Sequence, residues 1–150
     1  MTDYCIKPET GYVPITPDAF HDWARQYLIC RRSLVAAAGY SPVPYFLLCR
    51  SIELEMKARL LKEQGWPPNV KAVKDGFGHH LIMAYNALPA TQRILTTADI
   101  NALTAADRIY SSKGFEYFQL EQAVNGFADV PPLAALDAVA EKLLPMTNGK

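Results

Sequence analysis

A charged stripe interrupts an otherwise apolar stretch, RSIELEMKARLL, which spans residues 50–61. On a helical wheel at about 100° per residue, Arg50, Glu53 and Lys57 lie between two apolar flanks. Glu53 and Lys57 are four residues apart, in the order that favours an ion pair along a helix, and Arg50 can join them. Burying charges costs free energy unless they are paired and hydrogen-bonded. The stripe is therefore the first candidate for a functional site.

Three interpretations of this stripe remain open. The charged side chains can form a self-satisfied ion network that fixes helix packing or the register of a dimer. They can instead form one wall of a polar groove that holds a ligand, with His79 added from a later segment. The helix can also be rotated or bent, so that the stripe is hydrated. On the opposite side of the wheel, Glu55, Arg59 and Lys62 are expected to face solvent.

Two adjacent histidines, His79 and His80, could act in acid–base chemistry or bind a metal ion. Neighbouring side chains on a helix point about 100° apart, so both rings do not easily face one site. Packing or capping at a helix start is the alternative role. No second set of spaced ligands accompanies them, so the sequence predicts no metal site and no cofactor. The catalytic candidates are limited to His79, His80 and Lys74, and the sequence favours a protein that is not an enzyme.

These side chains must be positioned by helices. Residues 16–150 are predicted to form one all-α domain, an antiparallel (up-and-down) bundle of about five helices. Residues 1–15 contain two prolines and one glycine and are expected to form an extended arm. Capping residues, prolines and apolar spacing set the limits of each helix. The predicted helices cover residues 17–38, 42–64, 79–89, 97–110 and a last segment that Pro131-Pro132 opens.

The connections between these helices are less regular. Residues 66–78 are expected to form a loop, and residues 90–96 an irregular turn. Residues 111–130 are expected to form either an aromatic loop packed on the bundle or a short helix near residues 118–124. The aromatic side chains in this last connection could also stack on nucleobases.

Composition restricts the class of protein. A chain of 150 residues suits one domain with a buried core. Its 15 basic and 15 acidic residues balance, so no overall field attracts nucleic acid or a membrane, although a local basic patch remains open. Three cysteines without C-x-x-C spacing indicate reduced thiols and a cytoplasmic protein. No apolar run approaches the ~20 residues that span a bilayer, and the first residues lack the order of a signal peptide.

Several motifs, taken in order, resemble the HEPN superfamily. Residues 42–65 are similar to the second helix of these proteins, an apolar helix with an I-E-L-x-x-K-A core that ends at glycine. The stretch FGHHL at residues 77–81 resembles the G-H-D-L start of the next helix in the family, with His80 in place of the aspartate. Residues 110–117 are faintly similar to an aromatic R-Y element, with Glu116 in place of the arginine. The resemblance covers most of the chain.

The resemblance implies an antiparallel bundle that is usually dimeric. Some HEPN proteins are metal-independent ribonucleases with an R-x4-6-H motif, and others are binding modules, including antitoxin-type partners of small nucleotidyltransferases. Neither His79 nor His80 has an arginine at that spacing, and Lys74 cannot give the bidentate phosphate contact of an arginine. The resemblance therefore implies a homodimeric, non-catalytic module that binds a nucleotide, RNA or protein partner in a bacterial stress, toxin–antitoxin or defence setting. A ribonuclease with a degenerate site and a structural dimerisation module are the alternatives.

Overall fold

The computed structural model of the chain describes most of the predicted helical domain. The predicted arm at residues 1–15 lies outside the described part. Wherever the structure describes the backbone, it is helical or irregular and contains no strand, which confirms the all-α class. The described residues are 16–35, 39–64, 70–117, 120–126 and 129–145.

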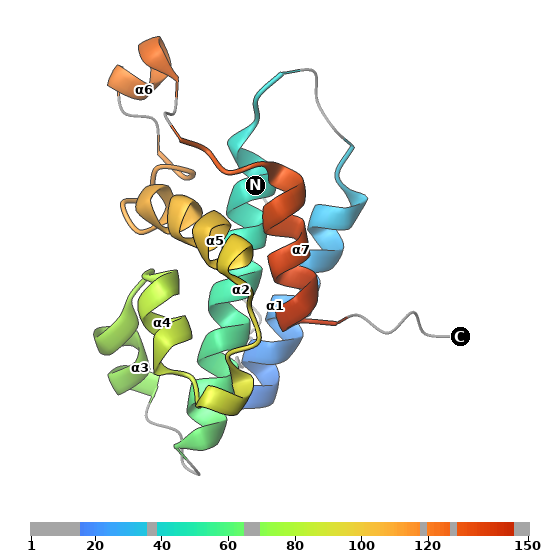
Figure 1. Cartoon of the computed structure of the whole chain (residues 1–150), viewed down its shortest axis with the longest axis vertical. Helices are drawn as coiled ribbons and strands as arrows, with labels where there is room; N and C mark the ends of the chain where they lie inside the picture. Colours follow the sequence, from blue (N-terminus) through green and yellow to red (C-terminus); the bar gives the residue numbers. More distant parts are fainter. Residues whose placement is uncertain (1–15, 36–38, 65–69, 118–119, 127–128, 146–150) are drawn as a thin grey trace, which may run out of the picture.

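The helices follow the predicted order, with two additions (Figure 1). The α-helices are α1 (Pro17–Ser33), α2 (Pro42–Glu63), α3 (Val70–Phe77), α4 (Leu81–Ala87), α5 (Thr97–Tyr110), α6 (Leu120–Asn125) and α7 (Leu133–Leu143), and a short 3-10 helix, η1, covers Ala90–Gln92. The predicted helices at residues 42–64 and 97–110 correspond to α2 and α5 within one residue.

Helix α2 occupies the middle of the molecule. Ser41 caps its first turn by accepting the Val43 backbone N–H at 3.4 Å, and Pro42 takes the first helical position. Figure 1 shows α2 running between its neighbours, and it contacts α1, α3, α4, α5 and α7. A helix surrounded in this way has no broad solvent face, which explains why apolar residues occur around most of its circumference.

The hydrophobic core forms around α2. Cys49 is fully buried there and packs as a small core residue. Helix α7 buries Leu136, Val139, Ala140 and Leu143, which recur at helical spacing, and it contacts α2 and α5. The fully enclosed side chains of this core include Leu28, Leu48, Ile52, Met56, Leu61, Leu81, Leu103, Leu136 and Leu143.

Helix α1 ends earlier than predicted. The sequence favours a helix up to residue 38, but Leu34 is extended and its backbone N–H closes the last turn on the Arg31 carbonyl oxygen. Val35 is 88% exposed, so a longer helix would bury nothing at this end. Residues 36–38 lie outside the described part of the chain.

The two added helices correct the predicted connections. Helix α3 occupies part of the segment expected to be a loop, and Phe77 at its end packs against the core. Helix α6 confirms the alternative of a short helix in residues 111–130. The predicted irregular turn after Pro89 contains η1. Phe115 is buried and stacks on Tyr45 with ring centroids 5.4 Å apart, so this aromatic side chain serves packing.

Helix α4 starts at Leu81, two residues later than predicted. His80 takes the N-cap position, but its side chain makes no capping hydrogen bond. The carboxylate of Asp107 on α5 instead accepts the Leu81 backbone N–H at 2.7 Å. A side chain from a neighbouring helix thus supplies the cap, which no local pattern in the sequence could show.

Candidate functional site

A buried carboxylate, Glu53, holds a cluster of polar side chains at the centre of the molecule. Its Oε1 accepts from Lys57 Nζ at 2.5 Å. Its Oε2 lies 3.2 Å from Arg50 Nη1 and 3.2 Å from His79 Nδ1. The Tyr110 hydroxyl donates to the same oxygen at 2.5 Å. The structure therefore brings together all four residues predicted for the polar groove and adds Tyr110; these five are called the Glu53 cluster below.

Three parts of the fold position the Glu53 cluster. Helix α2 supplies its charged stripe, Arg50, Glu53 and Lys57, at i, i+3 and i+7 spacing along one side. The connection between α3 and α4 supplies His79, and α5 supplies Tyr110 as its last residue. Gly78, next to His79, has a φ of 50°, in the left-handed region that favours glycine. Its carbonyl oxygen accepts from Lys57 Nζ at 2.7 Å, which ties the α3–α4 connection to α2.

Exposure divides the cluster into two layers. The side chains of Glu53 and Lys57 are 2% and 9% exposed, so they lie below the surface instead of lining a groove. The side chains of Arg50 and His79 are 31% and 36% exposed. Both nitrogen atoms contact the same Glu53 oxygen, so these two partly exposed side chains meet at the buried carboxylate. We call this exposed pair the Arg50–His79 edge.

The protonation states of the buried layer follow from its contacts. Burial on its own would raise the pKa of Glu53, but the charge and hydrogen bond of Lys57, the Tyr110 hydroxyl and Arg50 together hold this pKa below its usual value. Burial raises the pKa of Tyr110 strongly, and the Glu53 charge and hydrogen bond raise it further. Glu53 is thus an ionised acceptor, and Tyr110 is a neutral donor to it.

Two cations share the single Glu53 carboxylate. Arg50 and Lys57 both form ion pairs with Glu53, which leaves a surplus of positive charge in the cluster. Burial raises the pKa of the Cys49 thiol most, and the nearby carboxylates of Asp107 and Glu53 raise it further. However, the described contact of Asp107 is the N-terminal cap of α4. An anion arriving at the Arg50–His79 edge would meet the Arg50 guanidinium, whose charge is additional to the balanced Lys57–Glu53 pair below it.

Of the remaining catalytic candidates, the structure describes the side chain of His80 but not that of Lys74. His80 is exposed at the N-cap of α4, and it forms none of the described contacts of Glu53. Lys74 lies on α3, and its side chain is outside the described part of the structure. Of the two adjacent histidines, His79 alone faces the buried carboxylate, as expected from the divergent directions of neighbouring side chains.

A second buried carboxylate corrects the predicted solvent stripe. Glu55 is 5% exposed, and its oxygens contact His21 Nδ1 at 2.7 Å and Arg59 Nε at 2.8 Å. Arg59 also donates to the Leu143 carbonyl oxygen at the end of α7. Helices α1 and α7 thus cover a side of α2 that the wheel assigned to water, and only Lys62 of that stripe is exposed. The one feature of the sequence that could have indicated this buried ion pair is the i, i+4 spacing of Glu55 and Arg59.

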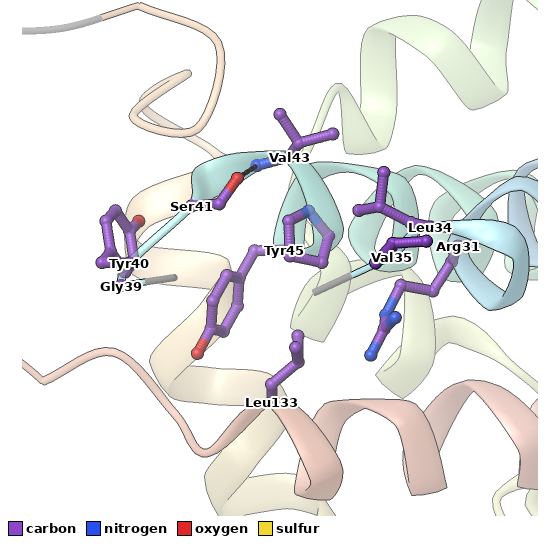
Figure 2. Close-up of a pocket in the computed structure, with 10 residues that line it drawn as sticks. Arg31, Leu34, Val35, Gly39, Tyr40, Ser41, Val43, Tyr45 and Leu133 are labelled. Carbon is purple, nitrogen blue, oxygen red and sulfur yellow. Dashed lines mark hydrogen bonds between the residues drawn. The ribbon is translucent and has the colours of Figure 1, made fainter. Parts of the chain in front are cut away.

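Apart from the Glu53 cluster, the structure has a hollow where α1 ends and α2 and α7 begin (Figure 2). Its volume is about 270 Å³. Figure 2 shows Arg31 and Tyr45 approaching from two sides, with Leu133 between them in this view. Arg31 forms an ion pair with Asp137 of α7 at 2.6 Å, so it bridges two helices.

Comparisons with known proteins do not identify a family for this chain. No protein family, no curated protein and no solved structure matches the chain. The similarity to the HEPN superfamily therefore stays a prediction. Within the described residues, no group of three or more His, Cys, Asp or Glu side chains is arranged to hold a metal ion. No helix there is both long and apolar enough to cross a bilayer.

Proposed function

We propose that this chain is a HEPN-like, non-catalytic module that binds a phosphate-bearing ligand, a nucleotide or RNA, at the Arg50–His79 edge. The observation that carries the proposal is the shared Glu53 oxygen, which holds two partly exposed donors, Arg50 and His79, over a buried layer in which Lys57 balances the charge of Glu53. A partly buried anion site of this kind has low local solvation, which strengthens charge-assisted hydrogen bonds.

The two exposed side chains have complementary roles in this proposal. The guanidinium of Arg50 is planar, and Glu53 engages its Nη1, so the same group can present further N–H donors to phosphate oxygens. The ring of His79 contacts Glu53 through Nδ1 and packs edge-on against Tyr110, with centroids 5.7 Å apart. These contacts fix the orientation of the ring before any ligand arrives, which lowers the entropy cost of binding.

The resemblance to HEPN proteins supplies the wider setting of the proposal. It implies an antiparallel arrangement of the helices, a homodimer, and a role in bacterial stress, toxin–antitoxin or defence systems, with an antitoxin or nucleotidyltransferase as partner. Catalysis is not part of the proposal because neither histidine follows an arginine at the spacing of the ribonuclease motif.

Thermal unfolding with added ligands tests the proposal. A ligand present at about 100 times its Kd adds roughly 2.7 kcal/mol to the free energy of unfolding, which raises Tm by on the order of 5–10 °C. We expect this shift with inorganic phosphate or a nucleoside monophosphate, and we expect Arg50→Gln to remove it. Arg93→Gln is the control, since Arg93 is an exposed arginine that forms none of the described contacts of the cluster. No shift with any phosphate compound would refute the proposal.

A structural lock is the second candidate function, and one observation favours it. Lys57 is bonded both to Glu53 and to the Gly78 carbonyl oxygen, so the buried layer fastens α2 to the α3–α4 connection without any ligand. If that is its whole purpose, Arg50→Gln changes stability or dimer formation but leaves Tm insensitive to phosphate. A degenerate ribonuclease would differ from both, because it would cleave RNA without added metal and lose that cleavage in His79→Ala.

A further inference from the structure

A pocket between α1 and α2 adjoins the Arg50–His79 edge. Its volume is about 380 Å³, within the range of small-ligand sites. Helix α1 contributes Trp23, Tyr27 and the exposed Cys30, while α2 contributes Leu47 and Arg50. Trp23 and Tyr27 are four residues apart and therefore lie on one face of α1. Two aromatic side chains, each partly buried against the core, thus line a pocket that has a cation in its wall.

Arg50 belongs both to this pocket and to the Glu53 cluster. Its Nη1 contacts Glu53, and the rest of the side chain lines the pocket beside Leu47. Burial on its own would lower the pKa of Arg50, but the charge of Glu53 raises it. Tyr27 is near enough to Arg50 to raise this pKa by a smaller amount. One ligand could therefore reach the Arg50–His79 edge with an anionic group and the aromatic side chains with another part.

We propose that this pocket receives the nucleobase of a nucleotide unit whose phosphate sits at the Arg50–His79 edge, an inference that rests on the proposed function. Aromatic side chains stack on any of the nucleobases. An arginine between the base pocket and the phosphate site can contact both the ring and the phosphate. Leu47 supplies an apolar wall for the ring. Free nucleotides and single-stranded RNA carry the same unit, so either can be the source of the ligand.

Alkylation of Cys30 reports directly on occupancy of the pocket. Cys30 is exposed in the pocket wall, whereas Cys49 is buried and its thiol pKa is raised by burial, so Cys49 is an internal control. The full chain is treated with iodoacetamide, and each cysteine is followed by mass spectrometry of its peptide. At about ten times the Kd of adenosine monophosphate, roughly a tenth of the protein is free, so we expect about tenfold slower alkylation of Cys30.

The choice of probes separates this inference from the proposed function. Inorganic phosphate and ribose 5-phosphate should raise Tm without slowing Cys30 alkylation, because they lack a base. Adenosine monophosphate should do both. A short oligoadenylate that protects Cys30 at lower concentration than the mononucleotide would identify single-stranded RNA as the source. If adenosine monophosphate raises Tm but leaves Cys30 alkylation unchanged, the base pocket is refuted and the phosphate site stands.

Substitutions at Trp23 provide a second readout. We expect Trp23→Leu to weaken adenosine monophosphate binding roughly tenfold or more, since it removes a stacking surface, and to leave the affinity for inorganic phosphate unchanged. Trp23→Phe keeps an aromatic face and should retain most of the affinity. Unchanged nucleotide affinity in Trp23→Leu would overturn the inference. If Trp23→Leu does not fold, Cys30 protection in the unsubstituted chain decides. If no phosphate compound binds at all, this inference falls together with the proposed function.

Discussion

Glu53 combines near-complete burial with a full negative charge, and its neighbours make that combination stable. Lys57 and Arg50 supply opposite charge, and Tyr110 and His79 supply two further polar contacts. A buried ion pair contributes little net stability compared with apolar packing, but removing one partner leaves an uncompensated charge in the interior. Substitutions within the Glu53 cluster should therefore be far more damaging than substitutions of exposed ion pairs.

Glu53→Gln tests this expectation at neutral pH. It leaves Lys57 and Arg50 without their shared carboxylate, so we expect a loss of roughly 3–5 kcal/mol in the free energy of unfolding. Glu141→Gln is the matched control, because Glu141 pairs with Arg32 at the surface and its side chain is 58% exposed; its cost should stay within about 0.5 kcal/mol. Urea titration of both variants gives the two values. Equal costs would show that the cluster is hydrated.

The lowered pKa of Glu53 predicts a dependence of stability on pH. Its pKa in the folded protein lies below the ordinary glutamate value of 4.5, so the unfolded chain takes up the proton first as the pH falls. The contribution of Glu53 is complete above this ordinary value and is lost as the pH falls through the lower, folded-state pKa. The stability gap between the wild-type protein and Glu53→Gln should therefore be constant near neutral pH and shrink in acid. A gap that widens in acid would contradict the assigned direction.

At the scale of helices, local sequence patterns predicted where each helix lies better than they predicted which other parts of the chain it contacts. Helix α5 was predictable because its cap, its first turn and its apolar spacing agree along the sequence. The start of α4 was not, since Asp107 caps it from another helix. Similarly, the wheel placed Arg50, Glu53 and Lys57 on one stripe, but it could not show that α1 and α7 cover Glu55 as well. Long-range packing decided each of these cases.

The start of α5 offers a test at this scale. Thr96 accepts the Asp99 backbone N–H, and the Asp99 carboxylate accepts the Thr96 N–H in return, which completes a capping box. Thr96→Ala should reduce the free energy of unfolding by about 1 kcal/mol. Thr97→Ala changes the same residue type one position later, outside the box, and should have little effect. Thermal unfolding of the pair distinguishes a cap from a general preference for threonine.

For the whole molecule, the central place of α2 links every part of the core. It contacts α1 and α7 on some sides and α3, α4 and α5 on others, and one hydrophobic cluster extends across these contacts. Ion pairs between α1 and α7 and between α5 and α7 add connections at the surface. The sequence predicted a single domain from its length and the absence of a linker, and the shared core is the physical feature that would make it unfold as one unit.

A single cooperative transition is therefore expected. Far-ultraviolet circular dichroism follows all helices, whereas fluorescence of Trp23 in a Trp66→Phe background follows the α1–α2 contact alone, since the chain has two tryptophans. The two signals should give coincident denaturation curves. A separate early transition in fluorescence would mean that α1 leaves the remaining helices before they unfold.

The crowding of donors around Glu53 also constrains how this sequence can change. Replacing Glu53 alone leaves Lys57 and Arg50 without their shared carboxylate. Replacing Lys57 alone removes the group that joins Glu53 to the Gly78 carbonyl oxygen. Exchanging the whole set for well-packed apolar side chains can nevertheless be neutral or stabilising. A folded apolar variant would thus be separated from the present sequence by intermediates that fold poorly. The stripe on α2 is an epistatic unit, and a redesign of this helix should vary its members together.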